Sequence, residues 1–298
     1  MAYVLSLISD PARAALEPSL VERARAAVKG GPGRVLADGV ACDIALDAGG
    51  GEDAAGLLEC ARNAVGGAPV DVNILAGDDR RKRLLIADMD STIIGQECLD
   101  ELAEFANLRQ RVSAITERAM RGELDFDAAL RERVAMLKGV PETALEETFR
   151  NRITLTPGAR TLVQTMNAAG ATTLLVSGGF TFFTARVAAA AGFKRHQANT
   201  LLIENGALAG KVEEPVLGRA AKQDALLRAA AEAGLSLEET LAVGDGANDL
   251  SMLARAGLGV AFHAKAAVAE TARARIDHGD LTALLYLQGI PQTEFSEP

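Results

Sequence analysis

The chain has 298 residues, of which 49% are hydrophobic and 24% are charged, and it contains no tryptophan. This length suffices for one large domain and a smaller one, with a core built from Ala, Leu, Val and Ile. The 31 basic and 40 acidic residues give a net charge of −9, which argues against a nucleic-acid partner because phosphates require a basic face.

Residues 1–80 are predicted to form a small unit of their own. Short apolar runs and helical spacing predict the order βαββαβ, with one or two strands in the third range: strand 3–8, helix 20–28, strands 35–46, helix 54–65 and strand 70–75. Glycine-rich breaks fall at 30–33 and 49–51. This order is typical of a ferredoxin-like α+β domain. The polar run 77–83 predicts a solvated linker, so we place the domain boundary there.

A second apolar run, Leu84 to Ala87, suits a strand that is buried on both faces. Asp88 and Asp90 follow it directly. Ligands of open α/β sheets gather at the carboxyl ends of strands, and a divalent cation lets two close carboxylates persist. A capped turn explains the same residues equally well when they are taken alone.

The next stretch, from Gly95 to about Arg150, is predicted to be helical because its apolar residues recur at helical spacing. Pro157 and Gly158 end this block. The block interrupts the strand–helix alternation that continues beyond it. The later elements are predicted in this order: helix 161–169, strand 172–176, helix 180–191, a hairpin within 196–212 around Asn205-Gly206, helix 219–233, strand 241–243, helix 250–256, strand 258–262 and helix 280–287.

Polar groups again follow two of these strands. Ser177-Gly178-Gly179 comes after one strand, Gly244 to Asp249 (GDGAND) after another, and Lys222 lies near the start of a helix. In their order, DxDST, SGG, Lys and GDGxND resemble the four motifs of the haloacid dehalogenase (HAD) superfamily. The flanks DMDSTIIGQECLDELAE and FDAALRERVAMLKG are similar to the phosphoserine phosphatase family.

This resemblance covers roughly residues 83–287 and implies an α/β fold. A Rossmann-like core with a parallel sheet is expected over 81–298, with a helical cap at about 95–156 that closes over the active site. The unit at 1–80 is similar in outline to the ACT-like domains that precede some members, although it carries no ligand fingerprint.

The implied activity is hydrolysis of O-phospho-L-serine to L-serine and phosphate through an aspartyl-phosphate, the last step of serine biosynthesis. Asp88 matches the nucleophile and Asp90 the general acid and base. Mg²⁺ is the implied cofactor, bound by Asp88, the backbone carbonyl of Asp90 and Asp245. Asn248 and Asp249 match positions that orient this site.

The resemblance also assigns the substrate contacts. Ser177, Gly178 and Lys222 match the phosphate-binding positions, since hydroxyl and amide donors and a point charge suit phosphate oxygens. Glu97 and Arg133 match the positions that hold the ammonium and carboxylate groups. Met120 and Phe126 match the apolar positions that shield the pocket, and Asn248 matches the remaining substrate-binding position. Without the resemblance, Lys222 and Arg133 would be solvated surface residues and Met120 a core residue.

Two other functions stay open. A phosphotransferase of this superfamily would pass the phosphoryl group to homoserine, and measuring phosphohomoserine against free phosphate separates the two. Alternatively, residues 1–80 sense serine and regulate the rest, which calorimetry with L-serine tests. The expected partner is a small-molecule substrate. A homodimer, and the preference between L- and D-phosphoserine, are left undecided.

The expected location is cytoplasmic. The three cysteines are odd in number and form no CxxC pair, which favours reduced thiols. No apolar run approaches the ~20 residues of a membrane span, and no basic segment precedes the apolar N-terminal residues, so we predict neither a membrane partner nor a signal peptide.

Overall fold

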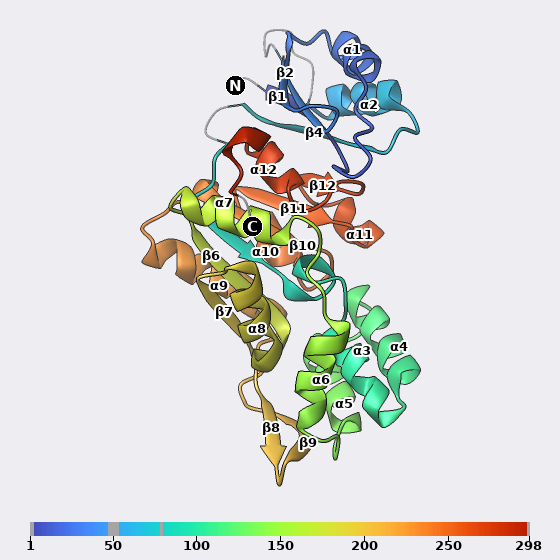
Figure 1. Ribbon diagram of the computed structural model, residues 1–298, viewed down its shortest axis with the longest axis vertical. Coiled ribbons are helices and arrows are strands. Elements are labelled where there is room, and N and C mark those ends of the chain that lie inside the picture. Colours follow the sequence, from blue (N-terminus) through green and yellow to red (C-terminus); the bar gives the residue numbers. More distant parts are fainter. Residues whose placement is uncertain (1–2, 47–53, 78–79, 297–298) are drawn as a thin grey trace.

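The computed structural model describes residues 3–46, 54–77 and 80–296. An N-terminal unit lies at one end, a parallel-sheet core in the middle and a helical cap at the other end (Figure 1). The predicted glycine break at 49–51 lies outside the described residues. No helix of the described residues is long and apolar enough to cross a membrane.

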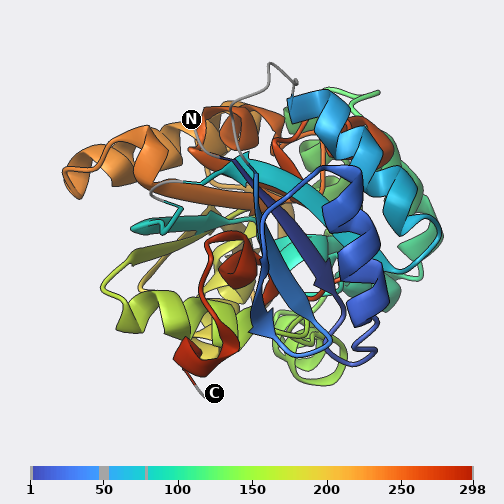
Figure 2. The same ribbon diagram turned by 90° about the horizontal axis from the view of Figure 1, so that it is seen from above.

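The N-terminal unit has the predicted βαββαβ order. Its elements are β1 (Tyr3–Ser9), α1 (Pro18–Ala27), β2 (Gly33–Ala37), β3 (Ala41–Leu46), α2 (Ala54–Val65) and β4 (Val70–Ala76). The strands pair antiparallel in the order β2-β3-β1-β4. Helices α1 and α2 pack side by side on one face of this sheet (Figure 2). The ferredoxin-like arrangement is therefore confirmed.

The core is a six-stranded parallel sheet in the order β12-β11-β10-β5-β6-β7. Its strands are β5 (Leu84–Ala87), β6 (Thr172–Phe180), β7 (Arg195–Asn199), β10 (Thr240–Gly244), β11 (Leu258–Phe262) and β12 (Ala274–Ile276). The helices that accompany it are α7 (Ala159–Ala168), α8 (Thr181–Ala191), α9 (Arg219–Glu232), α10 (Leu250–Arg255), α11 (Ala266–Ala269) and α12 (Ala283–Leu287). The α/β class is confirmed.

Strand β5 is fully buried because helices cover both faces of the sheet. Leu84 and Ile86 pack with residues of α9 and α10, whereas Leu85 and Ala87 pack with residues of α7 and α8. Alternate residues of a strand point to opposite faces, so an apolar run of four is what this central position requires.

The helical block forms the cap. It contains α3 (Cys98–Ala103), α4 (Arg109–Met120), α5 (Phe126–Met136) and α6 (Thr143–Arg152). Helix α5 begins at Phe126 because the side chain of Asp125 accepts the amide of Ala128 at 2.8 Å. The predicted hairpin, β8 (Leu201–Glu204) and β9 (Ala207–Val212), leaves the core and packs on α5. Its contact with the cap was not predicted.

Four sequence expectations need correction. Strand β6 continues past residue 176 to Phe180, α12 is limited to Ala283–Leu287, and the edge strand β12 was not predicted. The 77–83 run is not simply a solvated linker, because Arg80 is largely buried and forms an ion pair with Asp43 of β3. Charged side chains predict exposure, but here a partner on the neighbouring unit compensates burial.

Candidate active site

Three neighbouring strands of the core end at one edge of the sheet. In the parallel register, Ala87 at the end of β5 pairs with Leu175 of β6 and with Val243 of β10. The residues that follow these strands therefore lie close together, and they include Asp88 and Asp245. This is the edge at which the motifs predicted a site.

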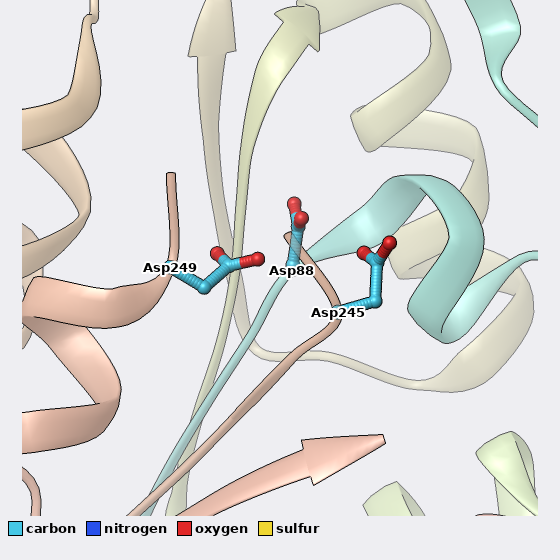
Figure 3. A group of neighbouring side chains, drawn as sticks. All are labelled: Asp88, Asp245 and Asp249. Atoms are coloured by element: carbon cyan, nitrogen blue, oxygen red, sulfur yellow. The ribbon is translucent and has the colours of Figure 1, made fainter. Parts of the chain in front are cut away.

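Asp88, Asp245 and Asp249 form a buried group of carboxylates (Figure 3). One oxygen from each lies within 4.8 Å of the others. Lys222 bridges two of them, with its Nζ 2.7 Å from Asp88 Oδ1 and 2.6 Å from Asp249 Oδ1. Asp249, which was expected to orient the site from behind, thus has its carboxylate within the group itself.

The charge of this group is not balanced by Lys222 alone. Burial raises the pKa of Asp88 well above its ordinary range, the charge of Asp249 raises it further, and Lys222 opposes both. Burial and Asp249 also raise the pKa of Asp245 to about 7. Oxygen ligands with excess negative charge are what Mg²⁺ and similar hard cations bind, so the residues fit the implied metal.

The carboxylate of Asp90 points to different partners. Its Oδ1 accepts the amide of Cys98 at 2.8 Å, and its Oδ2 accepts the hydroxyl of Ser177 at 3.0 Å. The amide of Gly179 donates to Ser177 Oγ at 2.8 Å. Burial raises the pKa of Asp90, while the hydrogen bonds from Cys98 and Ser177 lower it. A buried carboxyl with a raised pKa can hold a proton for transfer.

The turn at Met89–Ile93 connects the core site to the cap. Ser91 has a left-handed backbone with φ 55°, a costly conformation for a residue other than glycine. Its hydroxyl donates to Glu97 Oε1 at 2.7 Å, and Thr92 Oγ1 donates to Asp245 Oδ1 at 3.3 Å. The two hydroxyls of this turn therefore hold one carboxylate of the cap and one of the core.

Arg133 of α5 is buried within the cap. Its Nη1 donates to Thr116 Oγ1 at 2.9 Å, and Thr116 in turn donates to Asp100 Oδ1 at 2.7 Å. Burial lowers the pKa of Arg133, and the charges of Glu97 and Asp100 oppose that change. The guanidinium of Arg133 is therefore held in one orientation, near the acidic side chains of Glu97 and Asp100.

A small pocket of about 30 Å³ lies between the cap residues and the core residues. Its lining includes Asp88, Asp90, Glu97, Arg133, Ser177, Gly178, Phe126 and Asn248. The ring of Phe126 lies directly over Gly178, because a Cβ added there would be 2.4 Å from Phe126 Cζ. Asn248 Oδ1 is buried without a hydrogen-bond partner among the described residues.

Nearly all the predicted site residues converge on this region, with Lys222, Asp245 and Asp249 next to Asp88. The side chain of Met120 lies outside the described part of the chain. Sequence analysis missed the contacts of Thr92, Thr116 and Asp100. Thr92 belongs to the DxDST motif and could have been included, whereas no local pattern marks the other two.

Comparisons with known proteins agree with this geometry. The family model of haloacid dehalogenase-like hydrolases matches residues 85–254. A phosphoserine phosphatase of Albidiferax ferrireducens is 48% identical over 210 residues, which cover 69% of this chain and 89% of that protein.

Two solved structures are also similar. A phospho-aspartyl intermediate analogue of phosphoserine phosphatase has a TM-score of 0.66 at 39% identity and covers 69% of this chain and 98% of its own. A probable phosphoserine phosphatase of Vibrio cholerae has a TM-score of 0.76 at 32% identity. The match covers 98% of this chain and 88% of that one. The chain therefore belongs to the phosphoserine phosphatase family of the haloacid dehalogenase-like hydrolases.

Proposed function

We propose that this protein hydrolyses O-phospho-L-serine to L-serine and phosphate, with Mg²⁺ as its cofactor. The observation that carries the proposal is the pocket between core and cap, whose lining includes Asp88, Asp90, Glu97 and Arg133. The names of the relatives support the same substrate.

In the first step, the Asp88 carboxylate attacks phosphorus and the bond to the serine oxygen breaks. Asp90 gives its proton to that oxygen, so that L-serine leaves as an alcohol. In the second step, Asp90 takes a proton from water, whose oxygen attacks the aspartyl-phosphate. Phosphate then leaves and the Asp88 carboxylate is restored.

The metal would be held by Asp88, Asp245 and the backbone carbonyl of Asp90, next to Asp249. Bound there, the cation screens the repulsion between an anionic nucleophile and an anionic phosphate. Lys222 contributes a fixed positive charge next to Asp88. We propose that the Ser177 hydroxyl, which donates to Asp90 in this structure, turns to donate to a phosphate oxygen when the substrate is bound, together with the amide of Gly178.

Selection of the amino acid is proposed to come from Glu97 and Arg133. Both line this pocket with Asp88, and their opposite charges match the ammonium and carboxylate of serine. The pocket of about 30 Å³ is smaller than phosphoserine, so we propose that the cap moves outward to admit the substrate and returns before the reaction.

We also propose that the chain divides into 1–80 and 81–298, with the cap at about 95–156. Separate sheets and a separate hydrophobic cluster in the N-terminal unit support this division. A cytoplasmic location is proposed because all three cysteines are free thiols, which favours a reducing compartment.

The test is a phosphate-release assay over small phosphomonoesters, with Mg²⁺ and after complete chelation. We expect the highest kcat/KM for O-phospho-L-serine, loss of activity on chelation and recovery when Mg²⁺ is returned. Added homoserine should not divert the phosphoryl group. A preference for another monoester, or full activity in the chelator, would overturn the proposal.

A further inference from the structure

Asn199 is a buried asparagine at the end of β7, and none of the steps proposed above uses it. Its side-chain amide joins the end of β6 to the loop that precedes α9. Nδ2 donates to the carbonyl of Gly178 at 2.8 Å, while Oδ1 accepts the amide of Leu217 at 2.7 Å. Nδ2 also donates to the carbonyl of Leu217 at 3.4 Å, so one planar group makes all three contacts.

The first contact leads to the second carboxyl of the site. The Gly178 carbonyl and the Gly179 amide belong to one planar peptide, so fixing the carbonyl also fixes the direction of the N–H. That N–H donates to Ser177 Oγ at 2.8 Å, and Ser177 donates to Asp90 Oδ2 at 3.0 Å. The orientation of the Ser177 hydroxyl therefore depends on the side chain of Asn199.

The second contact, with Leu217, leads to the positively charged Lys222. Leu217 precedes α9, the helix that carries Lys222, and Lys222 Nζ lies 2.7 Å from Asp88 Oδ1. The side-chain amide of Asn199 thus holds both the loop before α9 and Gly178 near the end of β6. A buried carbonyl or amide that loses its partner is unfavourable, so both segments would rearrange without Asn199.

We propose that Asn199 is a positioning residue that aligns the Ser177–Asp90 pair and the Lys222 helix on the same phosphoryl group. The inference rests on the proposed function, because it assigns phosphate chemistry to both ends of the connection. It predicts a loss in the reaction steps that use Asp90, beyond any loss of stability.

Asn199→Asp is the most direct variant, since it keeps the acceptor for the Leu217 amide and removes the Nδ2 donor to the carbonyls of Gly178 and Leu217. Asn167→Asp is a matched control. Asn167 Nδ2 donates to the Gly192 carbonyl at 2.7 Å and its Oδ1 accepts the Thr173 hydroxyl at 3.0 Å. It makes the same pattern of contacts, but it joins segments that do not line the active-site cavity.

The experiment compares kcat/KM for two esters that lack ammonium and carboxylate groups, phenyl phosphate and p-nitrophenyl phosphate, together with phosphoserine. Removal of a direct transition-state donor costs about 10²–10³-fold. For Asn199→Asp, which acts through Ser177, we expect a loss of about 10- to 100-fold on phenyl phosphate and phosphoserine. The loss on p-nitrophenyl phosphate should be smaller, because nitrophenolate leaves without a proton from Asp90.

Asn167→Asp should lower the melting temperature comparably and leave the kcat/KM values for all three substrates near those of the wild type. The proposal is overturned if Asn199→Asp matches this control, or if both phenyl esters lose equally. If Asn199→Asp does not fold, Asn199→Ala serves in the same comparison. If the wild type cleaves the phenyl esters but not phosphoserine, the proposed substrate is refuted. The comparison of Asn199→Asp with Asn167→Asp on the two phenyl esters still decides the role of Asn199.

Discussion

Arg133 shows how a single residue is expected to select the substrate. Its guanidinium is buried in the cap and lines the active-site cavity with Glu97. An unpaired charge left in a closed cavity costs about 2–5 kcal/mol. Arg133→Ala should therefore lower kcat/KM for phosphoserine about 30- to several-thousand-fold, at 1.4 kcal/mol per decade.

The control substrate is p-nitrophenyl phosphate, which has neither charged group and should lose much less. Arg131→Ala is a matched control variant, because Arg131 lies on the same helix but pairs with Glu214 at the surface. Glu97→Gln should show the same selective loss as Arg133→Ala. An equal loss on both substrates would mean that these residues position the cap or the phosphate and do not recognise the amino acid.

At this scale, the residues that the sequence identified are those in short motifs. Asp88 and Asp245 directly follow β5 and β10, Asp90 lies in the turn after β5, and Ser177 lies near the end of β6, so the parallel register brings all four together. Asn199 and the other contacts that hold these residues were missed. They join segments that are distant in sequence, and no spacing rule predicts such a meeting.

At the scale of elements, the contact between α5 and the end of β6 determines how the cap closes. The ring of Phe126, at the start of α5, covers Gly178, and a Cβ at Gly178 would lie 2.4 Å from it. Forcing extra volume into a packed contact costs about 1–3 kcal/mol. Gly178→Ala should therefore lower kcat/KM for all phosphomonoesters about 5- to 150-fold.

A double-mutant cycle isolates this contact. In a Phe126→Ala background, where the ring is gone, the added methyl group of Gly178→Ala should have little further effect. Gly56→Ala, in open space on α2, should leave kcat/KM unchanged. Additive losses from Gly178→Ala and Phe126→Ala would show that the methyl group acts on the phosphate site and not on cap closure.

Most elements were predicted because their apolar spacing is regular, and the errors follow from tertiary contacts. The hairpin β8–β9 was expected from Asn205-Gly206, which have φ values of 52° and 77°. The position of this hairpin against the cap was not expected. Leu208 exchanges backbone hydrogen bonds with Gly139 and Val140 of the cap. The cap is thereby supported by a segment that lies outside the predicted cap range.

At the scale of the whole molecule, the N-terminal unit is fastened to the core by buried contacts. Asp71 of β4 accepts the amides of Asp277 and Gly279 at 2.7 and 2.8 Å. Asn73 exchanges two hydrogen bonds with the backbone of Arg275. Six apolar residues of the unit join the main core cluster: Ile8, Leu36, Ala37, Val40, Ala41 and Leu75. No sequence pattern distinguished this face from an exposed one.

Removal of residues 1–80 should separate stability from catalysis. The 210 matched residues are 89% of the Albidiferax relative, so about 26 of its residues lie outside the match, too few for a similar unit. We expect the truncated protein to keep the catalytic site but to melt at a lower temperature, because an apolar face of the core becomes exposed.

The measurements are the melting temperature and the kcat for phosphoserine of the soluble truncated protein. A milder control, Asp71→Ala in the full chain, should lower the melting temperature and leave kcat unchanged. A folded but inactive truncation would show that the N-terminal unit completes the active site.

The most direct test of the proposed reaction is to trap the phosphoenzyme. The wild-type protein with Mg²⁺ is mixed with labelled O-phospho-L-serine, quenched rapidly in acid, digested and analysed by mass spectrometry. We predict a phosphoryl group on the peptide that contains Asp88, and neither label nor phosphate release in Asp88→Asn. A phosphoryl group on another residue, or phosphate release by a deamidation-free Asp88→Asn at the wild-type rate, would contradict the account.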